Sequence, residues 1–260
     1  FYVDTLLGLG INGSYTPDNP GISKGMRSFL THKDYRGLLD TVAKRYPDTK
    51  HIDEQLAKGF QFMRSYYPNY KLPRVIYFVS WLNNYGAITY DTTLGIGLDM
   101  FLTNDYPYYK SVGVPDYLGV QLSEEYIPVG AFRAIYQEQR PFIPEGKPLL
   151  DMMIQRGKEA YFLGKIIPFV PEHTRLGYTA EQLKWAAEHE ACVYNFFVNE
   201  KFLYETNWQT IIRYVNDAPS STGLPGSPGN IGTWLGLQIV KSYMANHSDV
   251  KLPDLVRNNT

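Results

Sequence analysis

Apolar residues recur every three to four positions along two segments near the start of the chain, residues 33–45 and 51–67. In the second segment this stripe consists of Ile52, Leu56, Phe60, Met63 and Tyr67. This spacing places the apolar side chains on one face of a helix. We therefore expect two amphipathic helices in this part of the chain.

The period then changes from helical to strand-like. The segment PRVIYFVS (73–80) is a short run of β-branched and aromatic residues, and TLGIGLDMF (93–101) is another. Between them, YGAITY (85–90) follows a turn signal at Asn83–Asn84. Short runs of this composition, bounded by turn residues, are typical of strands. The three segments predict one small sheet.

From about residue 120 the helical period returns and persists to the end. Pro128 suits the first turn of a helix that runs to about Gln137. Thr179 with Gln182 and Thr206 with Gln209 match the capping-box pattern. Further helices are predicted at 148–167, 179–199 and 207–216, and after the loop 216–229 from Pro228 onward.

These segments predict a single α+β domain over residues 1–260, mainly helical. The small sheet lies at about 70–101 and a helical half at about 120–257. A chain of 260 residues is long enough to bury a substantial core.

Composition narrows the classes of function. The chain has 25 basic and 26 acidic residues, so it lacks the basic excess of a nucleic-acid-binding protein. Its one cysteine rules out an internal disulfide and a cysteine-rich zinc site. The 22 tyrosines predict a core and surface rich in aromatic rings that carry a polar group.

The glycine-rich segment GSPGNIGTWLGLQIVKSYM (226–244) has the outline of a phosphate-binding loop that enters a helix. Such a loop requires a preceding strand and a Gly-Lys-Ser/Thr ending, whereas here Gly229 is followed by Asn230. Gly232 and Gly236 instead share one helix face, as do Gly157 and Gly164. We interpret these glycines as points where helices approach each other closely.

Three polar residues interrupt otherwise apolar helix faces: Arg133, Glu190 and Gln238. A charged group on a core-facing stripe is costly unless it is paired. One interpretation is ordinary buried pairing, with Glu190 bound to an arginine or lysine. The other is that the three residues line an internal cleft, where a buried carboxylate could act as a general acid or base.

The familiar catalytic motifs are absent from the sequence. The five histidines form no H-E-x-x-H pair, and there is no G-x-S-x-G elbow. His189 adjoins Glu190 and so points to a different helix face, which favours a surface position. We expect Cys192 to be a small apolar residue beside Trp185 and Phe196.

The C-terminal string SPGNIGTWLGLQIVKSYM (227–244), followed by LPDLV (252–256), resembles the signature of the gliding-motility lipoprotein GldB family of Bacteroidetes. Three upstream segments resemble the same family in order: 95–109, 149–168 and 176–204. The resemblance implies a lipoprotein on the periplasmic face of the cell envelope, anchored through a lipid-bearing cysteine upstream of Phe1. It implies partners among envelope proteins of a gliding or secretion apparatus, with no cofactor.

The family is also distantly similar to predicted zinc peptidases that carry an H-E-x-x-H helix. Segment 129–139 stands at the position of that helix but has no histidine, and Arg156 stands where a carboxylate would bind metal. This resemblance implies a zincin-like scaffold without zinc, with Arg133 and Arg156 in the former metal region and Glu190 paired to one of them. The candidate cleft comprises Arg133, Arg156, Lys158, Tyr161, Glu190, Tyr194, Trp234 and Gln238.

The expected function is therefore that of a non-catalytic binding or assembly component of the gliding type, with a degenerate peptidase-like cleft. Two alternatives stay open. One is a glycan or small-ligand binding module that uses the aromatic surface. The other is a metal-independent hydrolase that acts through Glu190 with arginine support.

Overall fold

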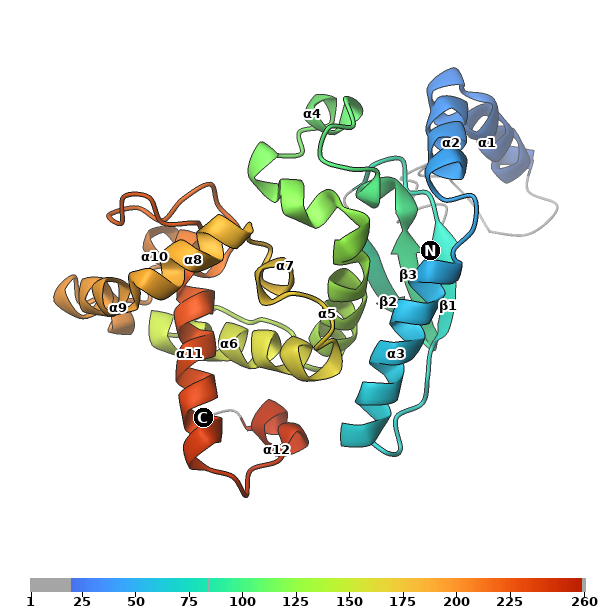
Figure 1. Cartoon of the computed structure of the whole chain (residues 1–260). Coiled ribbons are helices and arrows are strands. Elements are labelled where there is room, and N and C mark those ends of the chain that lie inside the picture. Colours follow the sequence, from blue (N-terminus) through green and yellow to red (C-terminus); the bar gives the residue numbers. More distant parts are fainter. Residues whose placement is uncertain (1–19, 84, 259–260) are drawn as a thin grey trace.

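The computed structural model describes residues 20–83 and 85–258, and Figure 1 shows the arrangement of the elements. The first half confirms the predicted helices and small sheet, although Asn84 of the expected turn lies outside the described residues. Its elements are α1 (Pro20–Thr31), α2 (Lys33–Arg45), α3 (Lys50–Tyr66), β1 (Arg74–Phe78), β2 (Ala87–Tyr90), β3 (Thr93–Gly97) and α4 (Tyr108–Ser111).

The three strands form one sheet in the order β1-β3-β2. β1 runs parallel to β3, with Arg74 opposite Thr93, whereas β2 and β3 form an antiparallel hairpin. All three strands are shorter than the predicted segments, and β3 ends at Gly97 because the chain there turns into a 3-10 helix, Leu98–Phe101. The buried side chains of Leu94 and Ile96 turn toward the core from β3.

A buried carboxylate fixes the loop that follows β1. Asp99 accepts hydrogen bonds from the backbone N–H and the hydroxyl of Ser80 and from the backbone N–H of Leu82. Trp81 and Leu82 both have a positive φ, an uncommon conformation for such residues. Burial raises the pKa of Asp99, and its hydrogen bonds partly oppose that shift. Asp99 therefore has a structural role.

Among the residues described, the second half contains helices and loops but no strand. Its helices are α5 (Ile127–Gln139), α6 (Leu149–Ile166), α7 (Glu172–Leu176), α8 (Ala180–Glu188), α9 (Glu190–Asn199), α10 (Trp208–Val215), α11 (Ile231–Asn246) and α12 (Leu252–Arg257). The capping box of Thr179 and Gln182 is confirmed at the start of α8.

Three predicted helix boundaries in this half are wrong. The expected helix 179–199 breaks at His189, which separates α8 from α9. α10 is capped by Asn207 rather than Thr206, because the Asn207 side chain accepts from the N–H of Gln209. α11 begins at Ile231 rather than Pro228, after Asn230 in the left-handed conformation.

The buried apolar side chains form two clusters. One gathers α2, α3, the sheet, α5 and the end of α6. The other gathers the start of α6 with α8 to α11. Figure 1 shows α5 between the sheet and the C-terminal helices, with α6 crossed by α11. Helices α5 and α6 therefore lie where the two clusters meet.

The predicted glycine contacts are confirmed where α6 crosses α11. A Cβ added at Gly236 would lie 1.8 Å from the carbonyl oxygen of Met153, and one added at Gly157 would lie 2.3 Å from the carbonyl carbon of Gly236. Backbone therefore packs directly on backbone. Gly232 makes a similar approach to the carbonyl of Tyr214 on α10. Gly164 differs, since an added Cβ would meet only the side chain of Arg175.

Candidate functional site

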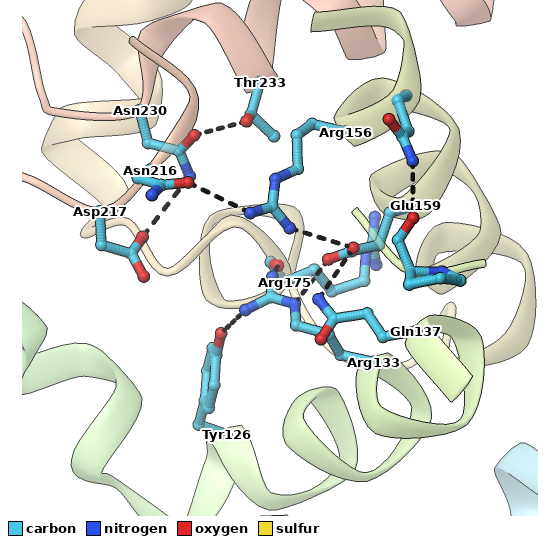
Figure 2. Close-up of polar contacts among 12 residues, drawn as sticks. Tyr126, Arg133, Gln137, Arg156, Glu159, Arg175, Asn216, Asp217, Asn230 and Thr233 are labelled. Atoms are coloured by element: carbon cyan, nitrogen blue, oxygen red, sulfur yellow. Dashed lines mark hydrogen bonds and ion pairs between the residues drawn. The ribbon is translucent and has the colours of Figure 1, made fainter. Parts of the chain in front are cut away.

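A cluster of charged side chains lies between α5 and α6, drawn in Figure 2. Arg133 comes from α5, and Arg156 and Glu159 come from α6. Positions three apart lie on the same side of a helix, so Arg156 and Glu159 face α5 together. Glu159 is only 5% exposed. The structure therefore brings the two predicted arginines together, around a carboxylate that the sequence analysis did not name.

Glu159 is held by three side chains. Arg133 Nε lies 2.8 Å from its Oε1, and Arg156 Nη1 lies 3.4 Å from its Oε2. Gln137, one turn beyond Arg133 on α5, donates from Nε2 to the same Oε2 at 3.1 Å. A buried carboxylate with two cations and an amide around it is fixed in position, because each of these contacts compensates part of its lost hydration.

Arg133 is also bound to the elements on its other side. It donates to the Tyr126 hydroxyl and, at 3.2 Å, to the backbone carbonyl of Arg175. Burial by itself lowers the pKa of Arg133, but Tyr126, Glu159 and Asp217 outweigh it, and the pKa is raised. Burial raises the pKa of the Tyr126 hydroxyl to about 12, against the opposing effect of Arg133. Arg133 is therefore a fixed cation, and Tyr126 is a neutral hydroxyl that accepts a hydrogen bond from it.

Arg156 has a looser environment. Its guanidinium lies over the ring of Phe142, 3.9 Å from the ring centroid, and Nη2 donates to Asn216 Oδ1 at 3.2 Å. Its Nε, like that of Arg133, is buried and has no well-aligned hydrogen-bond partner among the described residues. Burial lowers the pKa of Arg156, and Glu159 offsets only part of that effect. Of the two arginines, Arg156 is therefore the less fully compensated.

Amide and hydroxyl side chains line the wall opposite the arginines. Asn230 Nδ2 approaches Asp217 Oδ1 at 3.5 Å, and Thr233 donates to Asn230 Oδ1. Figure 2 shows these residues beside Asn216, across from Arg133 and Glu159. The hollow between these walls is open to solvent on one side, measures about 380 Å³ and is also lined by Tyr117. The hollow is therefore lined by hydrogen-bond donors and acceptors and by side chains of both charges.

A second hollow continues the first. It measures about 350 Å³ and shares Leu118, Arg133 and Gln137 with it. Its remaining lining is largely apolar and includes Ala87 at the start of β2. Together the two hollows make a cleft with a charged end beside α11 and an apolar end beside β2. We refer to the pair as the arginine cleft.

The other predicted cleft residues do not lie there. Glu190, Tyr194 and Gln238 line a different hollow between α9 and α11. Lys158 lines a third cavity. Trp234 is 2% exposed within the C-terminal core, and Tyr161 is half-buried, packed against both clusters.

The expectation that Glu190 faces the core is wrong, and so is its expected pairing with Arg133 or Arg156. Glu190 is exposed at the first position of α9. The break at His189, whose ring stacks on Trp185 with centroids 4.3 Å apart, ends the apolar stripe of α8. α9 begins a new register in which Val193 and Phe197 are buried.

The same new register exposes Cys192, which was expected to be a small apolar residue beside Trp185 and Phe196. His189 itself is partly buried by its stacking on Trp185, and its Nδ1 lies 2.8 Å from the carbonyl oxygen of that residue. The prediction that His189 lies on the surface is therefore only partly confirmed.

The sequence contains one pattern that could have identified Glu159 as a site residue, and the sequence analysis did not use it. Arg156 and Glu159 have the spacing of a helical ion pair, in a helix that is apolar on several faces. Such a pair on a buried helix indicates a third charged partner elsewhere. The amides Asn216 and Asn230 gave no comparable signal, because both lie in loop-like sequence.

The residues of the cleft do not fit a zinc ion. Zinc in proteins takes thiolate, imidazole or carboxylate ligands, whereas guanidinium groups repel a cation. Across residues 20–83 and 85–258, no group of three or more His, Cys, Asp or Glu side chains is placed to hold a metal ion.

In the same part of the chain, no helix combines the length and apolar character needed to cross a membrane.

Comparison with known proteins agrees with the C-terminal signature. The family model for gliding motility protein GldB matches residues 2–260, and its short name marks the family as lipoproteins. No curated protein and no solved structure matches the chain. Because the match covers nearly the whole chain, this protein belongs to the GldB family of gliding motility proteins.

Proposed function

We propose that this protein is a non-catalytic binding component of a gliding apparatus, held at the cell envelope by a lipid anchor, and that the arginine cleft binds a polar segment of an envelope partner. Family membership supports the association with gliding. One observation carries the binding role: two arginines fixed by the buried Glu159 face a hollow of about 380 Å³ with amide walls.

The cleft suits a polar peptide for physical reasons. Its charged residues, Arg133, Arg156, Glu159 and Asp217, balance in sign, so the site selects hydrogen-bonding groups over net charge. Arg156 is the less fully compensated of the two arginines, because burial lowers its pKa and Glu159 offsets only part of that effect. A partner that supplies carbonyl groups would add hydrogen bonds to this guanidinium.

The proposal includes a distant zincin-like relation, in which α5 occupies the position of the histidine helix. Arg133 on α5, paired with Glu159, then supplies a fixed positive charge where a peptidase would hold its cation. Elemental analysis of protein purified without chelators tests this relation. We expect less than a tenth of an equivalent of zinc, on the order of adventitious metal, and one full equivalent would overturn it.

Photo-crosslinking in cells tests the binding role. A photoreactive phenylalanine analogue replaces Tyr117, which is 42% exposed at the edge of the cleft, and in a control replaces Tyr204, which is 77% exposed and lines no part of it. We expect an adduct with an envelope protein from position 117 that disappears when Arg156→Met is added. The same Arg156→Met variant should lower colony spreading in a gliding strain that lacks its own copy.

A matched control separates loss of binding from loss of fold. Lys165→Met removes a cation from the exposed side of α6 and should leave both the adduct and spreading unchanged. An adduct at position 117 that persists in full with Arg156→Met would contradict the proposal.

Glycan binding in the same cleft is the second candidate. It is favoured by Tyr117, whose exposed ring could stack on a sugar beside the amides of Asn216 and Asn230. Titration of the purified protein with peptidoglycan fragments separates the two candidates. Saturable binding that is lost in Tyr117→Ala would favour the glycan over a protein segment.

A hydrolase that acts through Glu190 with arginine support loses its structural basis. Glu190 lies on the exposed surface of α9, in a hollow that shares no lining residue with the arginine cleft.

A further inference from the structure

The hollow between α9 and α11 lies apart from the site of the proposed function. It is open to solvent, measures about 550 Å³ and shares no lining residue with the arginine cleft. The apolar part of its lining consists of Ala191 on α9 with Leu235 and Ile239 on α11. The remaining lining residues are Glu190, Tyr194, Gln238 and Ser242. Apolar surface and polar groups therefore meet in one open space.

The polar lining of this hollow is rich in hydrogen-bond acceptors. The Glu190 carboxylate is exposed, and no ion pair in the described part of the chain includes it. Gln238 donates from Nε2 to the carbonyl oxygen of Trp234 at 3.4 Å, which leaves its Oε1 as an acceptor. Ser242 is exposed, one turn further along α11. None of the described residues that line the hollow is basic. The hollow therefore offers acceptors and a negative charge without a cation to balance them.

Tyr194 adds an aromatic ring beside this charge. It follows Glu190 by four positions on α9, so the two side chains lie on the same side of that helix. Tyr194 is 52% exposed. An acidic residue in the first turn of a helix is favoured by the helix dipole, which is sufficient to explain Glu190 by itself. That effect does not explain the exposed ring and the apolar residues around the carboxylate. A carboxylate, an aromatic ring and apolar surface together are suited to a cation carried on an aliphatic chain.

We propose that this hollow binds an arginine side chain presented by a partner protein. The guanidinium group pairs with Glu190 and stacks on the ring of Tyr194. The aliphatic part of the arginine packs against Leu235 and Ile239, because long charged side chains cover apolar surface. Lysine suits the hollow less well, since an ammonium group is more strongly hydrated and has no planar face. A cavity of about 150 Å³ accommodates one benzene molecule, so this hollow has room for the side chain and for neighbouring atoms of the partner.

Nuclear magnetic resonance titration of the full chain with N-acetylarginine amide tests the chemistry of the hollow. We expect saturable binding with a Kd on the order of millimolar. The isosteric N-acetylcitrulline amide lacks the charge and should bind about tenfold more weakly, because the ion pair and the cation–π attraction are both lost. No binding of the arginine probe, or equal binding of the two probes, would overturn the proposal.

Substitutions on α9 locate the binding. Glu190→Gln and Tyr194→Leu should each weaken the binding of N-acetylarginine amide about threefold, which is the scale of one exposed ion pair or one cation–π contact. The double variant should weaken it about tenfold. Glu200→Gln removes an exposed carboxylate just after α9 that does not line the hollow, and it should leave the affinity unchanged. Because Glu190 and Tyr194 are both exposed, we expect these variants to keep the Tm of the wild type. Unchanged affinity in the double variant would contradict the assignment to this hollow.

Photo-crosslinking in cells tests for the partner. With a photoreactive phenylalanine analogue in place of Tyr194, we expect an adduct with a different protein, and mass spectrometry should place the crosslink beside an arginine of that protein. The adduct should disappear when Glu190→Arg is added and persist when Glu200→Arg is added. No adduct, an adduct of two copies of this chain, or an adduct that survives Glu190→Arg would overturn the assignment to a partner's arginine. These variants leave crosslinking from position 117 unaffected, so this proposal and the proposed function fail independently.

Discussion

Two sides of helix α6 pack against their neighbours in different ways within the four residues 156–159. Gly157 faces α11, where backbone packs on backbone without side chains between. Arg156 and Glu159 face α5, where charged side chains meet across a cleft. The glycine side has no space for a ligand, whereas the charged side lines a hollow of about 380 Å³.

The difference shows how the molecule combines rigidity with an accessible polar site. The crossing of α6 and α11 fixes the position of α6, because neither backbone can shift without a clash. Arg156 and Glu159 lie next to that crossing, so their backbone positions are fixed as well. Buried ion pairs contribute little net stability, since desolvation offsets their attraction. We infer that the glycine side supplies most of the stability and that the charged side adds little to it.

The largest effect is expected from Gly236→Ala. The new Cβ would lie 1.8 Å from the Met153 carbonyl oxygen, and no side-chain motion can relieve a contact with backbone. We expect the free energy of unfolding to fall by about 4 kcal/mol or more, as for severe overpacking. Urea denaturation followed by circular dichroism measures it. A loss below about 1 kcal/mol would mean that α6 and α11 can separate easily.

Removing the shared carboxylate gives the next largest effect. Glu159→Ala removes the one carboxylate that is ion-paired with both Arg133 and Arg156 among the described residues. We expect a loss of about 3 kcal/mol in the free energy of unfolding, as for breaking a buried ion pair. The same urea titration measures the loss. A neutral result would show that water already compensates both arginines.

Replacing the whole charged cluster should cost much less than removing one member. In the triple variant Arg133→Met, Glu159→Leu and Arg156→Met, the three ion-paired charges are removed together, and the exposed Asp217 keeps its contact with Asn230. We expect its free energy of unfolding to lie within about 1 kcal/mol of the wild type, while crosslinking from Tyr117 is lost. Stability as low as that of Glu159→Ala would show that the cluster itself holds α5 to α6.

The smallest effect, of opposite sign, is expected from Gly37→Ala in α2. A Cβ added there would meet nothing within 4 Å, so only helix propensity changes. We expect a gain of about 1 kcal/mol in the free energy of unfolding. This variant is the control for Gly236→Ala, since both make the same substitution inside a helix. A comparable loss in both would refute the packing explanation.

The features that were predicted correctly depend on residues close together in the chain. The period of Ile52, Leu56 and Phe60 on α3 and the capping box of Thr179 and Gln182 are properties of one or two turns. Gly157 and Gly236 were also recognised, because a glycine inside a helix is costly unless something packs against it. Even so, their partners in the contact were not identified.

The capping pattern in the sequence was misleading where two neighbouring residues could each cap the same helix. Thr206 matched the capping pattern as well as Thr179 did, but its backbone N–H and that of Asn207 are bound by the carboxylate of Glu205. That turn places Asn207 at the cap instead. Likewise the break at His189 shifted the buried face of α9 and brought Glu190 to the surface.

The sequence by itself determined the family, the small sheet, most helices, the close glycine packing and the two arginines of the cleft. Only the tertiary structure decided which carboxylate meets those arginines. Glu159 and Arg133 lie on separate helices, so their contact depends on how α5 and α6 are rotated about their axes and how far apart they lie. Packing of both cores sets that rotation, and helical periodicity within a single segment carries no information about it.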